Sequence, residues 1–191
     1  KAAIMGVAGV STGDVVLLAS TTISSDANIA YTSILTSAYS EYIFRFYDIH
    51  PATDGADFQW NVSDDTSSHS YDLSKQSSAY SSDQAENTGT PKVQYNTGTD
   101  LANSTSYQVF GKGVDNDNDA VSCGYLHIFN PSSTVFSTQY FSRANTVHQN
   151  YTSREDWIGG YVNATAAVTA INFQCSTGNM DAGKIKVWGV K

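Results

Sequence analysis

Three aspartates alternate with asparagines in residues 115–119, and carboxylate and amide oxygens are ligands that calcium prefers. The spacing of Asp115, Asp117 and Asp119 imitates the opening of an EF-hand loop, which needs Gly at position 6 and Glu at position 12. This chain has Ala120 and Leu126 at those positions, so we expect no EF-hand. Two interpretations stay open: an acidic, solvated hairpin turn, or three aspartates that gather a calcium ion in another way.

Residue types that carry catalysis are present, but their spacing forms no catalytic arrangement. Residues 9–13 (Gly-Val-Ser-Thr-Gly) match the nucleophile-elbow string, yet that motif needs a strand before Ser11 and a helix after it. Here a strand pattern follows Ser11, which favours a small-residue lead-in. Glu155 and Asp156 are adjacent, so on a strand their carboxylates would point to opposite faces. The histidines form no closely spaced pair, and we expect no enzyme. We expect His127, which falls inside a strand pattern, to be a core or cross-strand residue.

The two cysteines, Cys123 and Cys175, lie far apart in the sequence and in no zinc-ligand spacing. Small secreted scaffolds usually carry more cysteines at regular spacings. We therefore expect two unpaired, buried thiols on neighbouring strands, with a single disulfide as the alternative.

Aromatic side chains in and beside a long polar segment are candidates for recognition. Amphipathic rings supply contact area at little entropic cost, and they also stack on sugar rings. The alternative is that the same rings pack the segment onto the rest of the domain. The candidates are Trp60, Tyr71, Tyr80 and Tyr95.

The composition of the 191-residue chain excludes several classes of protein. Ten basic residues against 18 acidic ones give a net charge of -8, which would repel nucleic-acid phosphates. Only 15% of residues are charged, against about 25% in ordinary globular domains, and 25 Ser and 19 Thr take their place. Hydrophobic residues make up 40% of the chain, which argues against wholesale disorder. No segment has the apolar length of a membrane span, and we expect no membrane insertion.

Alternating patterns of period two, bounded by turn residues, predict strands throughout the chain, and helical periodicity is almost absent. Residues 42–49 carry apolar side chains on both faces, which predicts a central strand covered on both sides. We expect a single domain over residues 1–191, an all-β antiparallel sandwich of two sheets and jelly-roll type. Residues 1–13 are expected to form an extended lead-in. The expected strands are 15–23, 28–32, 42–49, 57–62, 107–110, 122–129, 135–141, 157–162, 168–175 and 184–190.

Residues 63–100 interrupt this pattern because they are rich in Ser, Asp, Asn and Thr. Loops of this length are uncommon in compact domains and are usually functional or paired elsewhere. We predict one long loop excursion over about 63–100, with short strands around Tyr71 and Val93.

Six strings of the chain are distinctive: residues 42–54, 57–60, 95–98, 115–119, 126–134 and 172–190. They resemble strings of a group of virion structural proteins from aquatic tailed bacteriophages, many of them cyanophages. Members share strands that end in I-x-P-A-T-D, a run L-x-x-F-N-P-S-S-T, and a final S-S-G-N-x-x-x-G-x-I-x-x-Y-G-I. This chain departs from them at Thr177 and Trp188, where the group has Ser and often Tyr.

The resemblance implies a non-enzymatic, sandwich-fold component of a phage particle, assembled in the bacterial host cytoplasm and displayed on the virion exterior. A tail fibre or appendage module that contributes to host-surface attachment is the favoured role. A capsid decoration or cement protein is the alternative within this class, and a secreted carbohydrate-binding module or lectin is the alternative of another class. The implied partners are other virion proteins, copies of the chain in a homotrimer or other cyclic oligomer, and a host-surface glycan.

Overall fold

Residues 13–87 and 89–191 are described by a computed structural model, in which they form twelve β-strands and no helix. All strand pairings are antiparallel, which confirms the all-β prediction. The strands are β1 (Val15–Asp26), β2 (Ile29–Tyr31), β3 (Glu41–Pro51), β4 (Ala56–Ser63), β5 (Lys75–Ala85), β6 (Lys92–Tyr95), β7 (Gln108–Val114), β8 (Ser122–Phe129), β9 (Gln139–His148), β10 (Thr152–Val162), β11 (Ala170–Cys175) and β12 (Met180–Val190).

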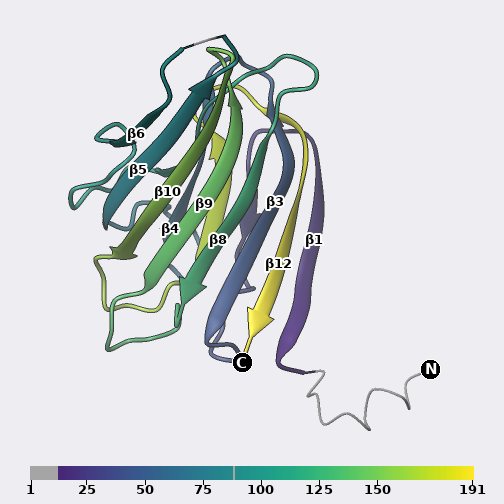
Figure 1. Cartoon of the computed structure of the whole chain (residues 1–191). Helices are drawn as coiled ribbons and strands as arrows, with labels where there is room; N and C mark the ends of the chain where they lie inside the picture. Colours follow the sequence, from purple (N-terminus) through teal and green to yellow (C-terminus); the bar gives the residue numbers. More distant parts are fainter. Residues whose placement is uncertain (1–12, 88) are drawn as a thin grey trace, which may run out of the picture.

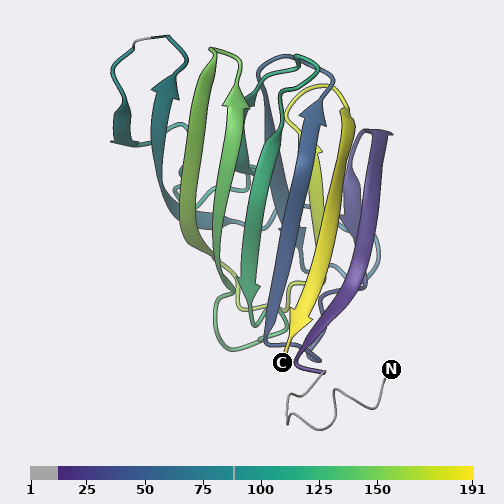
Figure 2. The same ribbon diagram turned by 45° about the vertical axis from the view of Figure 1, so that its right-hand side comes forward.

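The strands form one continuous sheet that curls until it nearly closes on itself. Its front part runs in the order β1-β12-β3-β8-β9-β10-β5-β6, and its back part runs β7-β4-β11-β2 (Figures 1 and 2). The two parts join where β7 meets β9, at the pair Val114 and His148. Because the front and back parts are hydrogen-bonded to each other, the predicted sandwich of two separate sheets is not confirmed.

The core lies between the front and back parts and is built from alternating inward side chains. Phe44 and Phe46 of β3 contact aromatic rings of the back part, with Phe46 centred 4.5 Å from Phe110 and 5.2 Å from Phe173. Edge-to-face and tilted contacts of this kind stabilise the packing beyond the apolar area that they bury. Trp60 is fully buried in the same core and meets Tyr140 edge to face at 4.8 Å.

Strand β3 is central, as the sequence predicts, because it pairs with β12 on one side and β8 on the other. The expectation that it is covered on both faces is wrong. Tyr42, Phe44 and Phe46 face the core, whereas Arg45 and Tyr47 are exposed on the outer face. Apolar and aromatic residues on the outer face of β3 therefore belong to the protein surface.

The predicted loop excursion over 63–100 contains an eleven-residue strand, β5, which pairs with β10 along its whole length. Its inward positions are small or polar, so the sequence lacks the apolar alternation by which strands are recognised. Ser77 and Ala79 face inward in this strand. The short strand expected around Val93 is present as β6, but the residues around Tyr71 form no strand, and β5 begins only at Lys75.

The described part of the chain offers no helix that could cross a membrane. Most of the Gly9–Gly13 string and of the expected lead-in lies outside the described residues. Both cysteines are free, as expected. Cys175 is buried, but Cys123 is only half-buried, and the two lie on β8 and β11, which are not neighbouring strands.

Candidate binding face

One row of aromatic and basic side chains crosses the outer face of the front sheet. The strand registers align Tyr80 of β5 with Trp157 of β10, and Trp157 with Arg143 of β9. Directly opposed residues on one face of antiparallel strands are close enough for their side chains to interact. We call this line the aromatic row, and its members from β6 to β12 are Tyr95, Tyr80, Trp157, Arg143, Tyr125, Arg45 and Lys186.

Three neighbouring pairs of the aromatic row are in stacking or cation–π contact. The rings of Tyr80 and Trp157 lie 5.0 Å apart with an interplanar angle of 10°. The guanidinium of Arg143 lies over the other face of Trp157, 5.3 Å from its centroid, and Arg45 lies 6.0 Å from the ring of Tyr125. Cation–π contacts of this kind attract the arginine side chains to the faces of the rings.

Among the basic members of the aromatic row, Arg143 has a carboxylate partner. Arg143 forms an ion pair with Glu155 at 2.7 Å, and this carboxylate raises the pKa of the guanidinium. Solvent reaches both members, since Arg143 is 46% and Glu155 26% exposed, so the pair adds little to stability. Arg143 therefore presents charged N–H donors next to an exposed aromatic stack.

A second row lies beside the first and is more apolar. His127 of β8 stacks on Phe141 of β9 at 4.6 Å, and its Nδ1 is hydrogen-bonded to the carboxyl group of Glu41. Phe141 is 42% exposed although it is a large apolar residue. Its neighbour across the strand pair is Gly159, which leaves that side of the Phe141 ring without a cross-strand partner side chain.

Gly159 forms the floor of a shallow pocket, which we call the Gly159 pocket. A Cβ atom placed on this glycine would meet no atom within 4 Å, so the space above it is open. The pocket has a volume of about 280 Å³ and is bordered by side chains from the aromatic row and by Phe141. Its lining residues are Ser78, Tyr80, Tyr125, Phe141, Ser142, Arg143, Trp157, Ile158 and Gly159.

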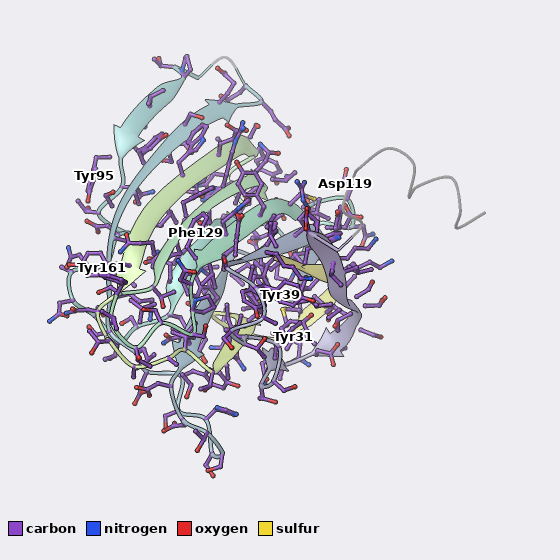
Figure 3. All side chains as sticks on the ribbon, turned by 90° about the horizontal axis from the view of Figure 1, so that it is seen from below. Tyr31, Tyr39, Tyr95, Asp119, Phe129 and Tyr161 are labelled. Carbon is purple, nitrogen blue, oxygen red and sulfur yellow. The ribbon has the colours of Figure 1, made fainter. Side chains whose placement is uncertain are left out.

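Of the four predicted recognition residues, the structure places two in the aromatic row and two outside it. Tyr80 and Tyr95 are 48% and 57% exposed and are cross-strand neighbours in the aromatic row. Tyr95 also lies at the outer side of the molecule in Figure 3, and its hydroxyl donates to Asp100 at 2.8 Å. Trp60 is a core residue, because strand alternation turns it inward, so its ring is not at the surface. Tyr71 is half-buried beside His69, outside the row.

The three aspartates lie in the turn between β7 and β8. Asp115 is buried and its carboxylate accepts a hydrogen bond from the backbone N–H of Asp117 at 2.9 Å, whereas Asp117 and Asp119 are exposed. This is the geometry of an Asx turn. Among residues 13–87 and 89–191, no group of three or more His, Cys, Asp or Glu side chains is placed to hold a metal ion. Calcium binding by these aspartates stays a prediction.

The other reactive side chains are dispersed. Glu155 and Asp156 point to opposite faces of β10, since Glu155 is half-exposed and Asp156 is buried. Burial, followed by the charges of Asp181 and Asp57, raises the pKa of Cys175 to about 12, so this thiol is protonated at neutral pH.

Sequence reasoning missed Trp157, Phe141, Arg143 and Gly159 as site residues. A signal was present, because the strand pattern of β10 carries a Trp two residues before a Gly on the same face. The sequence does not show the strand register, which places Tyr80 beside Trp157 and Phe141 beside Gly159.

Comparison of this chain with protein-family models, with curated proteins and with solved structures finds no match. The candidate site therefore rests on its own geometry.

Proposed function

We propose that the chain is a non-enzymatic structural module of a bacteriophage particle, built as a jelly-roll-type sandwich and displayed on the virion exterior. In this proposal it belongs to a tail fibre or appendage and binds a host-surface glycan. The observation that carries the binding role is the Gly159 pocket with the aromatic row on the outer face of the front sheet. The virion setting is supported by the resemblance of the strings in residues 42–54, 126–134 and 172–190.

The chemistry of the pocket fits a sugar ring. Pyranose rings present C–H faces that pack on aromatic rings, and hydroxyls at their edges that need hydrogen-bonding partners. Phe141 offers a ring face that is open on the Gly159 side, and Ser78 borders the pocket on the opposite strand. Arg143 supplies charged donors at the end where Trp157 stands.

Edges and tips of the sheet support contact with neighbouring copies or other virion proteins. Val15 and Leu17 on β1, and Val93 on β6, expose more than half of their surface on strands at the ends of the front sheet. Phe136, in the segment between β8 and β9, is 76% exposed. Exposed apolar groups beside strand edges are typical sites of association, and a homotrimer or other cyclic oligomer would cover them.

A capsid decoration or cement role is the alternative within the same class, because the apolar edges would serve it equally well. A secreted lectin is the alternative of another class, and it shares the glycan site. The location of the protein separates these three roles.

Electron microscopy of phage particles labelled with antibody to this chain tests the proposal directly. We expect label on the tail or its appendages. Label on capsid faces or vertices would establish the decoration role instead, and particles without label, with the protein free in the medium, would support the lectin.

A further inference from the structure

Lys75 is a lysine without access to solvent, and it lies against the side-chain amide of Asn61, which is also fully buried. Asn61 lies on β4 in the back part of the sheet, and Lys75 begins β5 in the front part. Nζ of Lys75 donates to Oδ1 of Asn61 and to the carbonyl oxygen of Leu73 at 2.8 Å. Within the described residues, Lys75 forms no salt bridge with a carboxylate.

The buried environment of Lys75 favours its neutral amine, which is the nucleophilic form of the side chain. Burial lowers the pKa of Lys75 to about 7, although the charge of Asp72 opposes this shift. A large share of the amine is then neutral at pH 7 to 8, and a neutral amine carries the lone pair that attacks a carbonyl carbon.

The amide of Asn61 is held as an electrophile. Its Oδ1 accepts a hydrogen bond from the backbone N–H of Val62 at 2.8 Å, in addition to the bond from Lys75. Its Nδ2 donates to the carbonyl oxygens of Tyr71 at 2.6 Å and Thr105 at 2.9 Å. A fixed N–H donor on the amide oxygen stabilises the negative charge that develops there during attack. The two carbonyls fix the amide plane while the amine approaches.

We propose that Lys75 and Asn61 join in an intramolecular isopeptide bond. Nζ attacks Cγ of Asn61, the Nζ–Cγ bond forms, and the Cγ–Nδ2 bond breaks. One proton passes from Nζ to Nδ2, which leaves as ammonia, so the step needs no oxidant and no co-reactant. The remaining N–H of Lys75 keeps the carbonyl of Leu73 as its acceptor.

The bond ties the front and back parts of the sheet together and closes a loop over residues 61–75. Closing a loop covalently removes conformational freedom from the unfolded chain, as a disulfide does. It does so without cysteine oxidation, in a chain whose two thiols are free. The inference is independent of the glycan site and of the location on a virion.

Mass spectrometry of the purified full-length protein tests the bond. We expect an intact mass lower than the sequence mass by one ammonia, and a peptide bond after Lys75 that resists trypsin. After cleavage beside Asp64 and Asp65, the fragments that hold Asn61 and Lys75 should remain joined. Loss of ammonia through a succinimide would leave these two fragments separate.

Two variants serve as controls. Lys75→Met keeps an apolar stem in the buried site and should show its full sequence mass and a lower melting temperature. Lys112→Met, at a half-exposed lysine paired with Asp57, should retain the ammonia deficit. A wild-type protein of full sequence mass whose Lys75 is cleaved normally overturns the inference, and so does a deficit with separable fragments.

Discussion

One histidine, at the junction of the front and back parts of the sheet, links the stability of the fold to pH. His148 belongs to the pair that joins β7 to β9 and is half-buried there. Burial, followed by the positive charge of Arg154, lowers its pKa below the ordinary value of 6.5. Its Nδ1 accepts a hydrogen bond from the backbone N–H of Asn150 at 3.2 Å, which requires that this nitrogen carry no proton. The folded protein therefore holds His148 in the neutral form.

Because the unfolded chain binds a proton at His148 more readily than the folded chain, stability falls as pH decreases. The loss begins near the unfolded pKa of 6.5 and ends below the lowered folded pKa, with a slope of at most about 1.4 kcal/mol per pH unit. Urea unfolding of wild type and His148→Gln at several pH values measures how the free energy of unfolding depends on pH. We expect a shallower slope in the variant than in the wild type. Equal slopes in wild type and His148→Gln would contradict this account.

At the residue scale, the sequence identified half of the predicted recognition residues correctly as surface rings. Tyr80 and Tyr95 are exposed, whereas Trp60 alternates inward with Phe58 and Val62. The inward direction of Trp60 was readable from that alternation. The open space above Gly159 could not be predicted from the sequence, because it depends on which residues of β5 and β9 lie beside this glycine.

At the scale of elements, a buried ion pair links three strands. Arg154 and Asp156 both point inward from β10, and the guanidinium binds the carboxylate through two nitrogens, the shorter contact being 2.8 Å. Arg154 also reaches Asp83 of β5 at 3.5 Å, and the backbone N–H of Lys112 on β7 donates to Asp156 at 3.4 Å. The pair thus joins β10 to its neighbour and to the back part of the sheet.

Replacing Arg154 with Ala leaves Asp156, which is 1% exposed, without its counter-charge. Breaking a buried pair in this way costs about 3–5 kcal/mol of unfolding free energy. Removing Arg143 from its solvent-accessible pair with Glu155 should cost much less, because solvent screens the two charges. Chemical denaturation of both alanine variants measures the difference, and equal losses would show that the buried pair does not stabilise the sheet.

Element prediction succeeded where apolar alternation is strong and failed where small polar residues face inward. Strand β3 has buried Phe44 and Phe46 in alternation, and it was placed correctly. Strand β5 presents Ser77, Ala79 and Ser81 to the interior, so it resembles a polar loop in the sequence. Its structure comes from pairing with β10, which is a tertiary constraint that one sequence does not display.

At the scale of the whole molecule, the curled sheet places its large aromatic cluster inside and a second set of rings outside. The aromatic row crosses the front sheet from Tyr95 on β6 to Lys186 on β12, strands that lie towards opposite ends of that sheet in Figure 1. Asp119, in the turn with the predicted calcium ligands, lies far across the molecule from Tyr95 and Tyr161 (Figure 3).

The most direct measurement of the central claim is polysaccharide binding by wild type and Gly159→Val, on an array that contains bacterial lipopolysaccharides. The valine meets no atom within 4 Å at its Cβ, so we expect an unchanged melting temperature with binding weakened at least about tenfold. Ser20→Val, at an exposed position on edge strand β1, should bind as wild type does. Wild-type binding that survives in Gly159→Val, or the absence of any glycan bound by wild type, would contradict the account.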